Sequence, residues 1–207
     1  MSNPFTITVL ISGGGTTLRN LIERKQDGRL APEIVRVISN NPNAAGLGFA
    51  EQANIECSVV DHRNFEDRHG FSEAIFSEIR SSRANLVVLG GFLRRLAIPP
   101  DFENRVVNIH PSLIPAFCGK GNYGARVHKA VIDYGCKVSG CTVHFVDDQY
   151  DHGPIIAQRT VPVLADDDPS TLAARVFEQE CELYPDTINL IASGQINIKG
   201  RIVELLS

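Results

Sequence analysis

The 207-residue sequence has no basic run longer than the Arg94-Arg95 pair, and its formal net charge is −4. Binding to nucleic acid or to an anionic membrane surface favours a basic patch, so we expect neither kind of partner. A long apolar run is also absent, because the first apolar segment breaks at Gly13 and no basic leader precedes it. We therefore expect neither a signal sequence nor a membrane span, and a cytoplasmic location.

The usual patterns of disulfides and metal sites are missing too. The five cysteines form no CxxC pair and have no histidine at a spacing typical of zinc, and their odd number favours reduced thiols. We expect no metal. With 43% hydrophobic and 21% charged residues the composition is that of an ordinary globular protein, so we expect a single domain over residues 1–207.

What is present in the first half is an alternation of apolar, β-branched segments with helical patterns. This alternation is typical of an α/β fold, and strands made mostly of Val, Ile and Leu indicate a sheet buried on both faces. The predicted strands are Thr6–Ser12, Glu33–Ser39, Glu56–Val60, Asn85–Leu89 and Arg105–Ile109, and the predicted helices are Thr17–Lys25, Ala44–Ala53 and Glu66–Arg80.

The second half has an α+β pattern. Two strands, Gly140–Val146 and Pro154–Val161, are separated by a short connection and predict an antiparallel pair. A helix begins at Pro169 and runs toward Gly194, with a bend or break expected near Pro185. The last segment, INIKGRIVEL, predicts a hairpin that turns at Lys199-Gly200.

The stretch ISGGGTTL, residues 11–18, leads from a strand through glycines into a helix. Unpaired N–H groups at such a helix start attract phosphate, although a plain tight turn has the same pattern. The GK[ST] of a Walker loop is absent, Leu18 stands where a dinucleotide fingerprint has its third Gly, and Ser39-Asn40-Asn41 replaces the acidic residue that would hold the ribose. The pattern predicts a phosphate site and not a dinucleotide site.

The segment NIHPSLIP follows another buried strand. Because residues two apart in a strand point to the same side, Asn108 and His110 should project together from its end. The segment VDDQYDHG, residues 146–153, which we call the acidic loop, offers Asp147, Asp148 and Asp151 as partners for the imidazole. A nearby carboxylate would favour the imidazolium, and an imidazolium beside an amide can donate to a developing oxyanion. Residue patterns alone leave the choice of acid open, and a capped strand end beside a surface loop has the same sequence.

Other polar residues are weaker candidates. Glu180 lies on the apolar face of the long helix and needs a partner there, either a structural one or a substrate group. His144 alternates with apolar strand residues and is more typical of a satisfied core histidine than of a ligand. The arginines Arg68, Arg94 and Arg95 could each hold an anion, although solvated surface arginines are more common.

Taken together, NIHPSLIP, GCTVHFVDDQYDHGPIIAQ and ARVFEQECELYP resemble the phosphoribosylglycinamide formyltransferase family. The resemblance covers nearly the whole chain. It implies a formyltransferase fold, in which a Rossmann-like parallel sheet in the N-terminal half is extended by antiparallel strands in the C-terminal half. It also implies formyl transfer from 10-formyltetrahydrofolate, as co-substrate, to the amine of 5-phosphoribosylglycinamide, the third step of purine synthesis. Its partners would be small molecules, and the protein would be a monomer or a homodimer.

The resemblance also implies roles for individual residues. Asn108 and His110 would polarise the formyl carbonyl, and Asp151 would keep His110 protonated. Many relatives have Ser-Asn where Thr16-Thr17 stand here, and the loop from Phe117 to His128 is longer than in many members. The implied acceptor-binding residues are Gly15, Thr16, Thr17 and Glu180, and the implied folate-binding residues are Arg68, Leu93, Arg94, Arg95, Leu96, Asn108, Asp147, Asp148, Gln149, Tyr150 and Asp151.

Three other functions compete with this one. Formyltetrahydrofolate deformylase shares the Asn, His and Asp set, but its members usually carry a further N-terminal domain. Methionyl-tRNA formyltransferase would add a C-terminal domain. A non-catalytic nucleotide-binding module would leave Asn108, His110 and Asp151 without a purpose.

Overall fold

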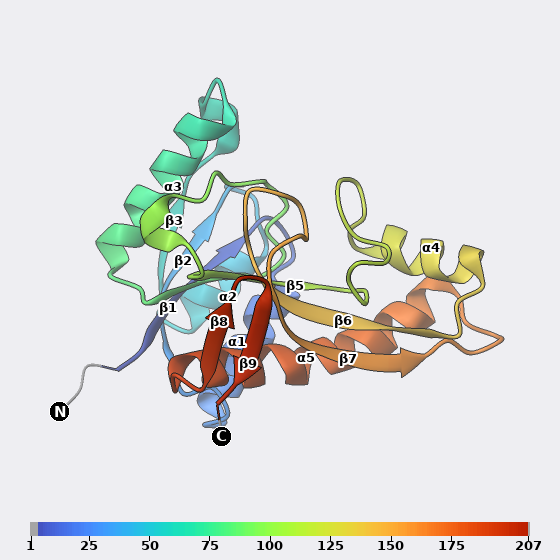
Figure 1. Ribbon diagram of the computed structural model, residues 1–207. Coiled ribbons are helices and arrows are strands. Elements are labelled where there is room, and N and C mark those ends of the chain that lie inside the picture. Colours follow the sequence, from blue (N-terminus) through green and yellow to red (C-terminus); the bar gives the residue numbers. More distant parts are fainter. Residues whose placement is uncertain (1–3, 207) are drawn as a thin grey trace. The chain divides into compact units, whose positions relative to one another are not determined.

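The computed structural model describes residues 4–206 and divides the chain into two compact units, the first ending at Val107 and the second beginning at Asn108 (Figure 1). Each unit is described by itself. Within residues 4–206, no helix is both long enough and apolar enough to cross a membrane.

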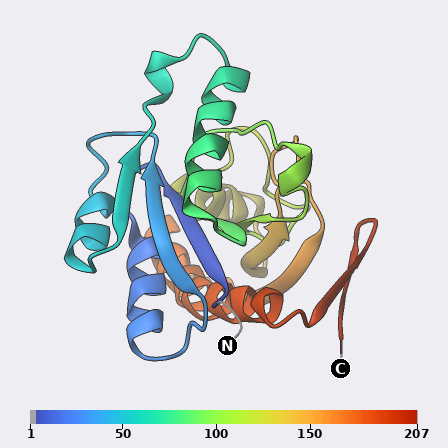
Figure 2. The same ribbon diagram turned by 90° about the vertical axis from the view of Figure 1, so that its left-hand side faces the viewer.

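The first unit contains a parallel sheet in the order β3-β2-β1-β4. The sheet is buried on both faces because helices cover each side: Figure 2 shows α1 on one side of β1 and β2 and α3 on the other. Val9 and Leu10 of β1, and all four residues of β4, are accordingly buried. The elements are β1 (Thr6–Ile11), α1 (Thr16–Gln26), β2 (Glu33–Ser39), α2 (Gly46–Gln52), β3 (Glu56–Val59), η1 (His62–Asn64), α3 (Arg68–Ser82), β4 (Leu86–Leu89) and η2 (Pro100–Phe102).

The strand that carries Asn108 and His110 is β5 (Val106–His110). In the second unit, β6 (Val138–Phe145) and β7 (Ile155–Pro162) form the predicted antiparallel pair, against which α5 (Pro169–Ala192) packs. A two-stranded C-terminal hairpin follows, made of β8 (Ile196–Lys199) and β9 (Ile202–Leu205). The parallel sheet of the first half and the antiparallel strands of the second confirm the predicted fold class.

Helix α5 continues unbroken through Pro185, so of the expected bend or break near this residue the break is wrong. A reciprocal capping box fixes the start of this helix. The Asp168 carboxylate accepts hydrogen bonds from the N–H groups of Ser170 and Thr171, and the Asp168 N–H donates to the Thr171 hydroxyl. Pro185 lacks one N–H donor but lies buried inside the helix, where packing around it outweighs the lost hydrogen bond.

Helix α4 (Ala125–Tyr134) was not predicted, because its first residues fall within the segment Phe117–His128 that the sequence indicates as a loop. The glycines before it hide the helical pattern, and Gly124 takes a positive φ of 53° just before the first turn. Val127 and Val131 are buried and supply the apolar face. The hairpin also turns one residue later than predicted, at Gly200-Arg201.

Candidate active site

Asn108 and His110 lie at the carboxyl end of β5, where the second unit begins, and each contacts another polar group of that unit. The Nδ2 atom of Asn108 lies 3.2 Å from Nε2 of His144. The Nδ1 atom of His110 lies 3.6 Å from Oδ2 of Asp151, whose other oxygen lies 3.8 Å from Nε2 of His144. The amide and the imidazole that the strand pattern pairs therefore meet a single carboxylate.

The geometry selects Asp151 among the three acids of the acidic loop. Asp151 Oδ2 accepts a hydrogen bond of 2.8 Å from the Gly119 N–H, and only 13% of its side chain is exposed. Asp147 instead contacts His152, with its Oδ2 2.6 Å from His152 Nδ1. Asp148 is exposed to solvent. The sequence alone could not separate these carboxylates, because all three lie in one irregular loop.

Both ring nitrogens of His110 face oxygen atoms that can only accept hydrogen bonds. Nε2 donates to the Phe117 carbonyl at 3.0 Å, and Nδ1 faces the Asp151 carboxylate. A neutral imidazole carries one N–H, whereas the imidazolium carries two. Only 5% of the His110 side chain is exposed, and its two nitrogens can donate to both oxygens at once only in the imidazolium, the form that can give a proton to a substrate oxygen.

The neighbouring His144 has a defined tautomer. Its Nδ1 lies 2.7 Å from the Phe145 carbonyl and must donate to it. Burial lowers the pKa of His144, so the ring is held neutral and Nε2 keeps a lone pair. That lone pair accepts an N–H of Asn108, which orients the amide and leaves its second N–H for another acceptor. The alternation of His144 with apolar residues indicated burial but not this contact with Asn108.

The loop that follows His110 is held by Thr142 of β6. The Thr142 hydroxyl donates to the Ser112 carbonyl at 2.6 Å and accepts from the Ile114 N–H at 3.1 Å. Gln158 of β7 donates to the same hydroxyl oxygen at 2.9 Å. These bonds join the segment that follows β5 to the antiparallel pair of β6 and β7. The paired strands therefore support the segment next to His110.

Glu180 lies on the half-buried face of α5, as the apolar stripe predicts. Burial raises the pKa of its carboxyl from 4.5 to about 7. Nearby Cys141 is fully buried in β6, and burial together with the charge of Glu180 raises the pKa of its thiol to about 12. A carboxyl that titrates near neutral pH is suited to exchange a proton with an amine or a hydroxyl.

In the first unit, the glycine loop leads into α1 as predicted. Gly15 stands at the N-cap with a φ of 72°, and no side chain caps the first N–H groups of this helix. A Cβ on Gly15 would lie 2.5 Å from the Gly46 Cα, so α2 approaches the loop too closely for any other residue. Thr16 is exposed and Thr17 half-buried, and the helix start presents open N–H donors that can hold a phosphate.

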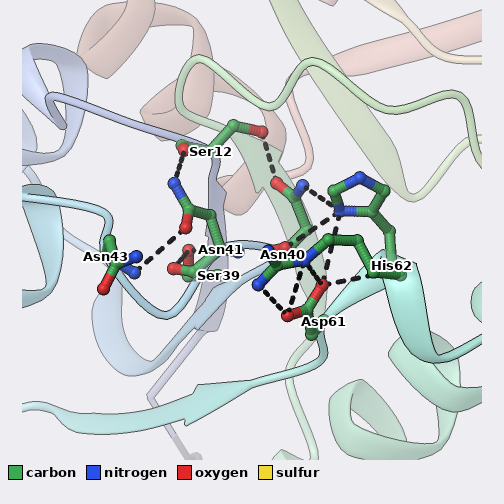
Figure 3. A network of polar contacts seen from close by, with 8 residues as sticks. Ser12, Ser39, Asn40, Asn41, Asn43, Asp61 and His62 are labelled. Carbon is green, nitrogen blue, oxygen red and sulfur yellow. Dashed lines mark hydrogen bonds and ion pairs between the residues drawn. The ribbon is translucent and has the colours of Figure 1, made fainter.

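A polar network holds this loop to its neighbours, and Figure 3 shows it around Ser12. The Ser12 hydroxyl donates to the Asn40 side-chain oxygen and accepts from the Leu93 N–H at 2.8 Å. The Asn40 amide in turn lies 3.2 Å from Nδ1 of His62, and Asn41 donates to the Ser12 carbonyl. Sequence reasoning noted Asn40 and Asn41 only as the absence of a ribose acid, and it missed this structural role.

The remaining predicted ligand residues are spread over loops and helix ends. Arg68 is exposed as the first residue of α3. In the segment after β4, Leu93 is exposed and Leu96 is buried, so their exposure differs although both were assigned to one folate site. Arg94, Arg95, Gln149 and Tyr150 are exposed. Within residues 4–206, no three His, Cys, Asp or Glu side chains gather in a group that could hold a metal ion.

Comparison with known proteins agrees with this fold. The sequence pattern of the family described as formyl transferase matches residues 5–188. The chain therefore belongs to the formyl transferase family. Within that family its place is among the phosphoribosylglycinamide formyltransferases, as one relative makes clear: the phosphoribosylglycinamide formyltransferase of Haemophilus influenzae is 35% identical over 201 residues, which are 96% of this chain and 92% of that protein.

Other relatives are longer. The trifunctional purine biosynthetic protein adenosine-3 of Gallus gallus is 40% identical over 199 residues, 95% of this chain, but this chain spans only 19% of it. Among solved structures, glycinamide ribonucleotide transformylase 1 of Symbiobacterium toebii is similar with a TM-score of 0.92 and 36% identity, over 100% of this chain and 96% of that one. The phosphoribosylglycinamide formyltransferase of Coxiella burnetii, solved with CHES, gives a TM-score of 0.89 and 37% identity, over 98% and 94%.

Proposed function

We propose that this protein transfers a formyl group from 10-formyltetrahydrofolate to the amine of 5-phosphoribosylglycinamide, giving formylglycinamide ribonucleotide and tetrahydrofolate. The observation that carries the proposal is the set formed by buried His110 with half-buried Asn108 and Asp151, in a chain of this family. The set combines two hydrogen-bond donors with one carboxylate, which is what an acyl transfer through an oxyanion needs.

In the proposed reaction the glycinamide nitrogen attacks the formyl carbon, a C–N bond forms, and the carbonyl oxygen becomes negative. The free N–H of Asn108 and an N–H of His110 donate to that oxygen. In the structure the Nε2–H of His110 is taken by the Phe117 carbonyl, so the substrate oxygen would replace this carbonyl as the acceptor. When the bond to the folate nitrogen breaks, that nitrogen receives a proton and the attacking amine loses one, so no net proton is consumed.

Asp151 would stabilise the imidazolium of His110 throughout this sequence. Its own conformation supports the role, because the Gly119 N–H holds one oxygen of the carboxylate in place. His144 contributes indirectly: its neutral ring accepts one N–H of Asn108 and so directs the other. A preorganised pair of donors costs little reorganisation when charge develops, and this is the main electrostatic source of catalysis in acyl transfer.

For the binding of the two substrates we propose the residues named from the family resemblance. The N–H groups at Gly15, Thr16 and Thr17 would hold the phosphate of the acceptor, which the uncapped start of α1 supports. Glu180, with a pKa of about 7, would meet the glycinamide end. The folate would be bound by Arg68, by residues 93–96 and by the acidic loop.

We further propose that residues 1–207 act as one formyltransferase domain, as a monomer or a homodimer, in the cytoplasm. The family match over residues 5–188 supports the single domain. Five free cysteines, none of them in a disulfide, support a reducing compartment.

A direct assay tests the function. The purified protein is incubated with 10-formyltetrahydrofolate, with and without glycinamide ribonucleotide, while tetrahydrofolate and formate are measured. Acceptor-dependent tetrahydrofolate without free formate is the expected result. Formate release that does not depend on the acceptor would instead assign the protein as a deformylase, and no turnover with either substrate would leave a binding module.

A further inference from the structure

Arg201 of the C-terminal hairpin contacts His152 of the acidic loop. We propose that Arg201, in the turn between β8 and β9, is a positioning residue that holds the acidic loop and thereby places Asp151 beside His110. The inference deepens the proposed function and rests on it, because it concerns the site of the same reaction. Figure 1 shows the turn of the red hairpin lying beneath the orange loop that joins β6 to β7.

Arg201 makes three polar contacts with His152, the residue next to Asp151. Its Nη2 atom donates to the His152 carbonyl at 2.7 Å. Its Nη1 atom lies 3.3 Å from Nε2 and 3.5 Å from Nδ1 of the His152 ring. A guanidinium presents several N–H groups in one plane, so it can hold the main chain and the side chain of one residue together.

His152 also contacts Asp147 within the acidic loop. Its Nδ1 lies 2.6 Å from Oδ2 of Asp147, and because a carboxylate only accepts, Nδ1 carries the proton. Nη1 of Arg201 lies closer to Nε2 of this ring than to Nδ1. The first acid of the loop is thus tied to the hairpin through one imidazole, while the carbonyl beside Asp151 is tied to it directly.

The conformation of Asp151 explains why a clamp is needed. Asp151 has a φ of 50°, a left-handed conformation that is uncommon outside glycine and costs free energy. Such a conformation persists only where neighbouring contacts hold it. The Gly119 N–H holds the carboxylate from one side, and Arg201 holds the following carbonyl from the other. The loop residues from 148 to 150 are exposed.

The hairpin itself is a firm base for this contact. Ile202, which follows Arg201, pairs in parallel with Ile155 at the start of β7, so the arginine arrives directly under the end of the acidic loop. Four antiparallel residue pairs join β8 to β9. A separate ion pair, Lys199 to Glu204 at 2.9 Å, lies within the hairpin.

This last pair supplies a matched control. Lys199→Ala removes a cation and an ion pair from the same hairpin, but the contact it breaks does not involve the acidic loop. Arg201→Ala removes the clamp. Arg201→Lys keeps the charge and can still reach the His152 carbonyl with one N–H group, but it loses the planar pair of donors.

Kinetics give the first test. We expect Arg201→Ala to lower kcat about tenfold, the scale of one lost charged hydrogen bond in an exposed setting, and to raise the KM for 10-formyltetrahydrofolate. The KM for the amine acceptor and the melting temperature should stay at their wild-type values. Arg201→Lys should recover part of kcat, and Lys199→Ala should behave as the wild type. Wild-type kinetics in Arg201→Ala, or equal losses in Lys199→Ala, would overturn the proposal.

A second measurement does not depend on activity. Hydrogen exchange of a peptide covering the acidic loop should speed up in Arg201→Ala and stay unchanged in Lys199→Ala. If the wild type does not transfer formyl groups, the proposed function fails while this exchange result still decides whether the clamp exists. If the wild type is active and exchange in the loop is the same in Arg201→Ala, the clamp is wrong and the proposed function stands.

Discussion

Nδ1 of His110 lies 3.6 Å from Oδ2 of Asp151, and both side chains are nearly closed off from solvent. Charges in such surroundings are screened less than on the surface, so the carboxylate acts strongly on the ring beside it. The other ring nitrogen faces the Phe117 carbonyl, so an acceptor oxygen lies beside each nitrogen of the ring. The proposed chemistry therefore depends on the two residues together.

Replacing Asp151 by Asn should slow the reaction steeply while both substrates still bind. The amide keeps much of the shape and hydrogen bonding of the carboxylate, but it removes the charge that stabilises the imidazolium. We expect kcat to fall by ~10²–10⁴-fold, the range typical of lost general acid–base catalysis. Steady-state kinetics with each substrate varied in turn, beside calorimetric binding, would measure the two effects separately.

Combining this change with His110→Ala tests whether the residues form one unit. Two substitutions that disable the same step should together cost much less than the sum of their separate losses in activation free energy. A double-mutant cycle in kcat/KM measures the interaction free energy between the two residues. Fully additive losses would contradict the pairing and would turn attention back to Asp147 and Asp148.

His144 should matter through the orientation of Asn108. His144→Phe removes the acceptor at Nε2 and leaves the Asn108 amide free to turn, so we expect kcat to fall about tenfold or more, short of the ~10²–10³-fold seen when an oxyanion donor is removed outright. His144→Gln retains an acceptor and should lose less. Equal activity of the two variants would show that the contact with Asn108 is unimportant.

Protonation of His144 should also lower the stability of the protein at acidic pH. Burial lowers the pKa of His144, so the unfolded chain takes up this proton at a higher pH than the folded protein does. The free energy of unfolding should therefore fall as the pH drops below about 6.5, the ordinary value for histidine. Chemical denaturation across this range should show a shallower dependence in His144→Phe. An unchanged slope would mean that His144 does not stay neutral in the fold.

The contribution of Glu180 to the free energy of unfolding should change with pH in the opposite direction. Because burial raises its pKa from 4.5 to about 7, the unfolded chain loses this proton first as the pH rises. The protein should lose stability between about pH 4.5 and pH 7, by up to about 3 kcal/mol, and no further above that range. Glu180→Gln should flatten this part of the curve, whereas Glu178→Gln, at an exposed position of the same helix, should not.

Thr17→Ala should raise the KM for the amine acceptor only modestly. The glycines of the loop let the main chain approach an anion closely, and the start of α1 has no side-chain cap, so the N–H groups are the expected donors. Thr16→Ala should behave similarly. Complete loss of activity in a folded Thr17→Ala protein, checked by circular dichroism, would show that the hydroxyl carries the binding.

Regular periodicity made most of the fold predictable. β2 has the bounds that its apolar run predicts, and the antiparallel pairing of β6 and β7 follows from two alternating segments with a short connection. Helix α4 escaped prediction because Gly124 and the glycines before it outweigh the short apolar face of Val127 and Val131 in a local pattern. The predicted break at Pro185 failed because packing along α5 outweighs the one hydrogen bond that proline cannot donate.

For the site, the sequence by itself determined which chemical groups are available: an amide and an imidazole two residues apart in a strand, a glycine loop before a helix, and a loop with three acids. Only the tertiary structure decided which acid meets His110, which tautomer His144 adopts and which residue supports the acidic loop. The physical reason is that alternation and spacing are properties of one segment, whereas a carboxylate 41 positions away, or an arginine in the last hairpin, is brought into contact only when separate strands pack together.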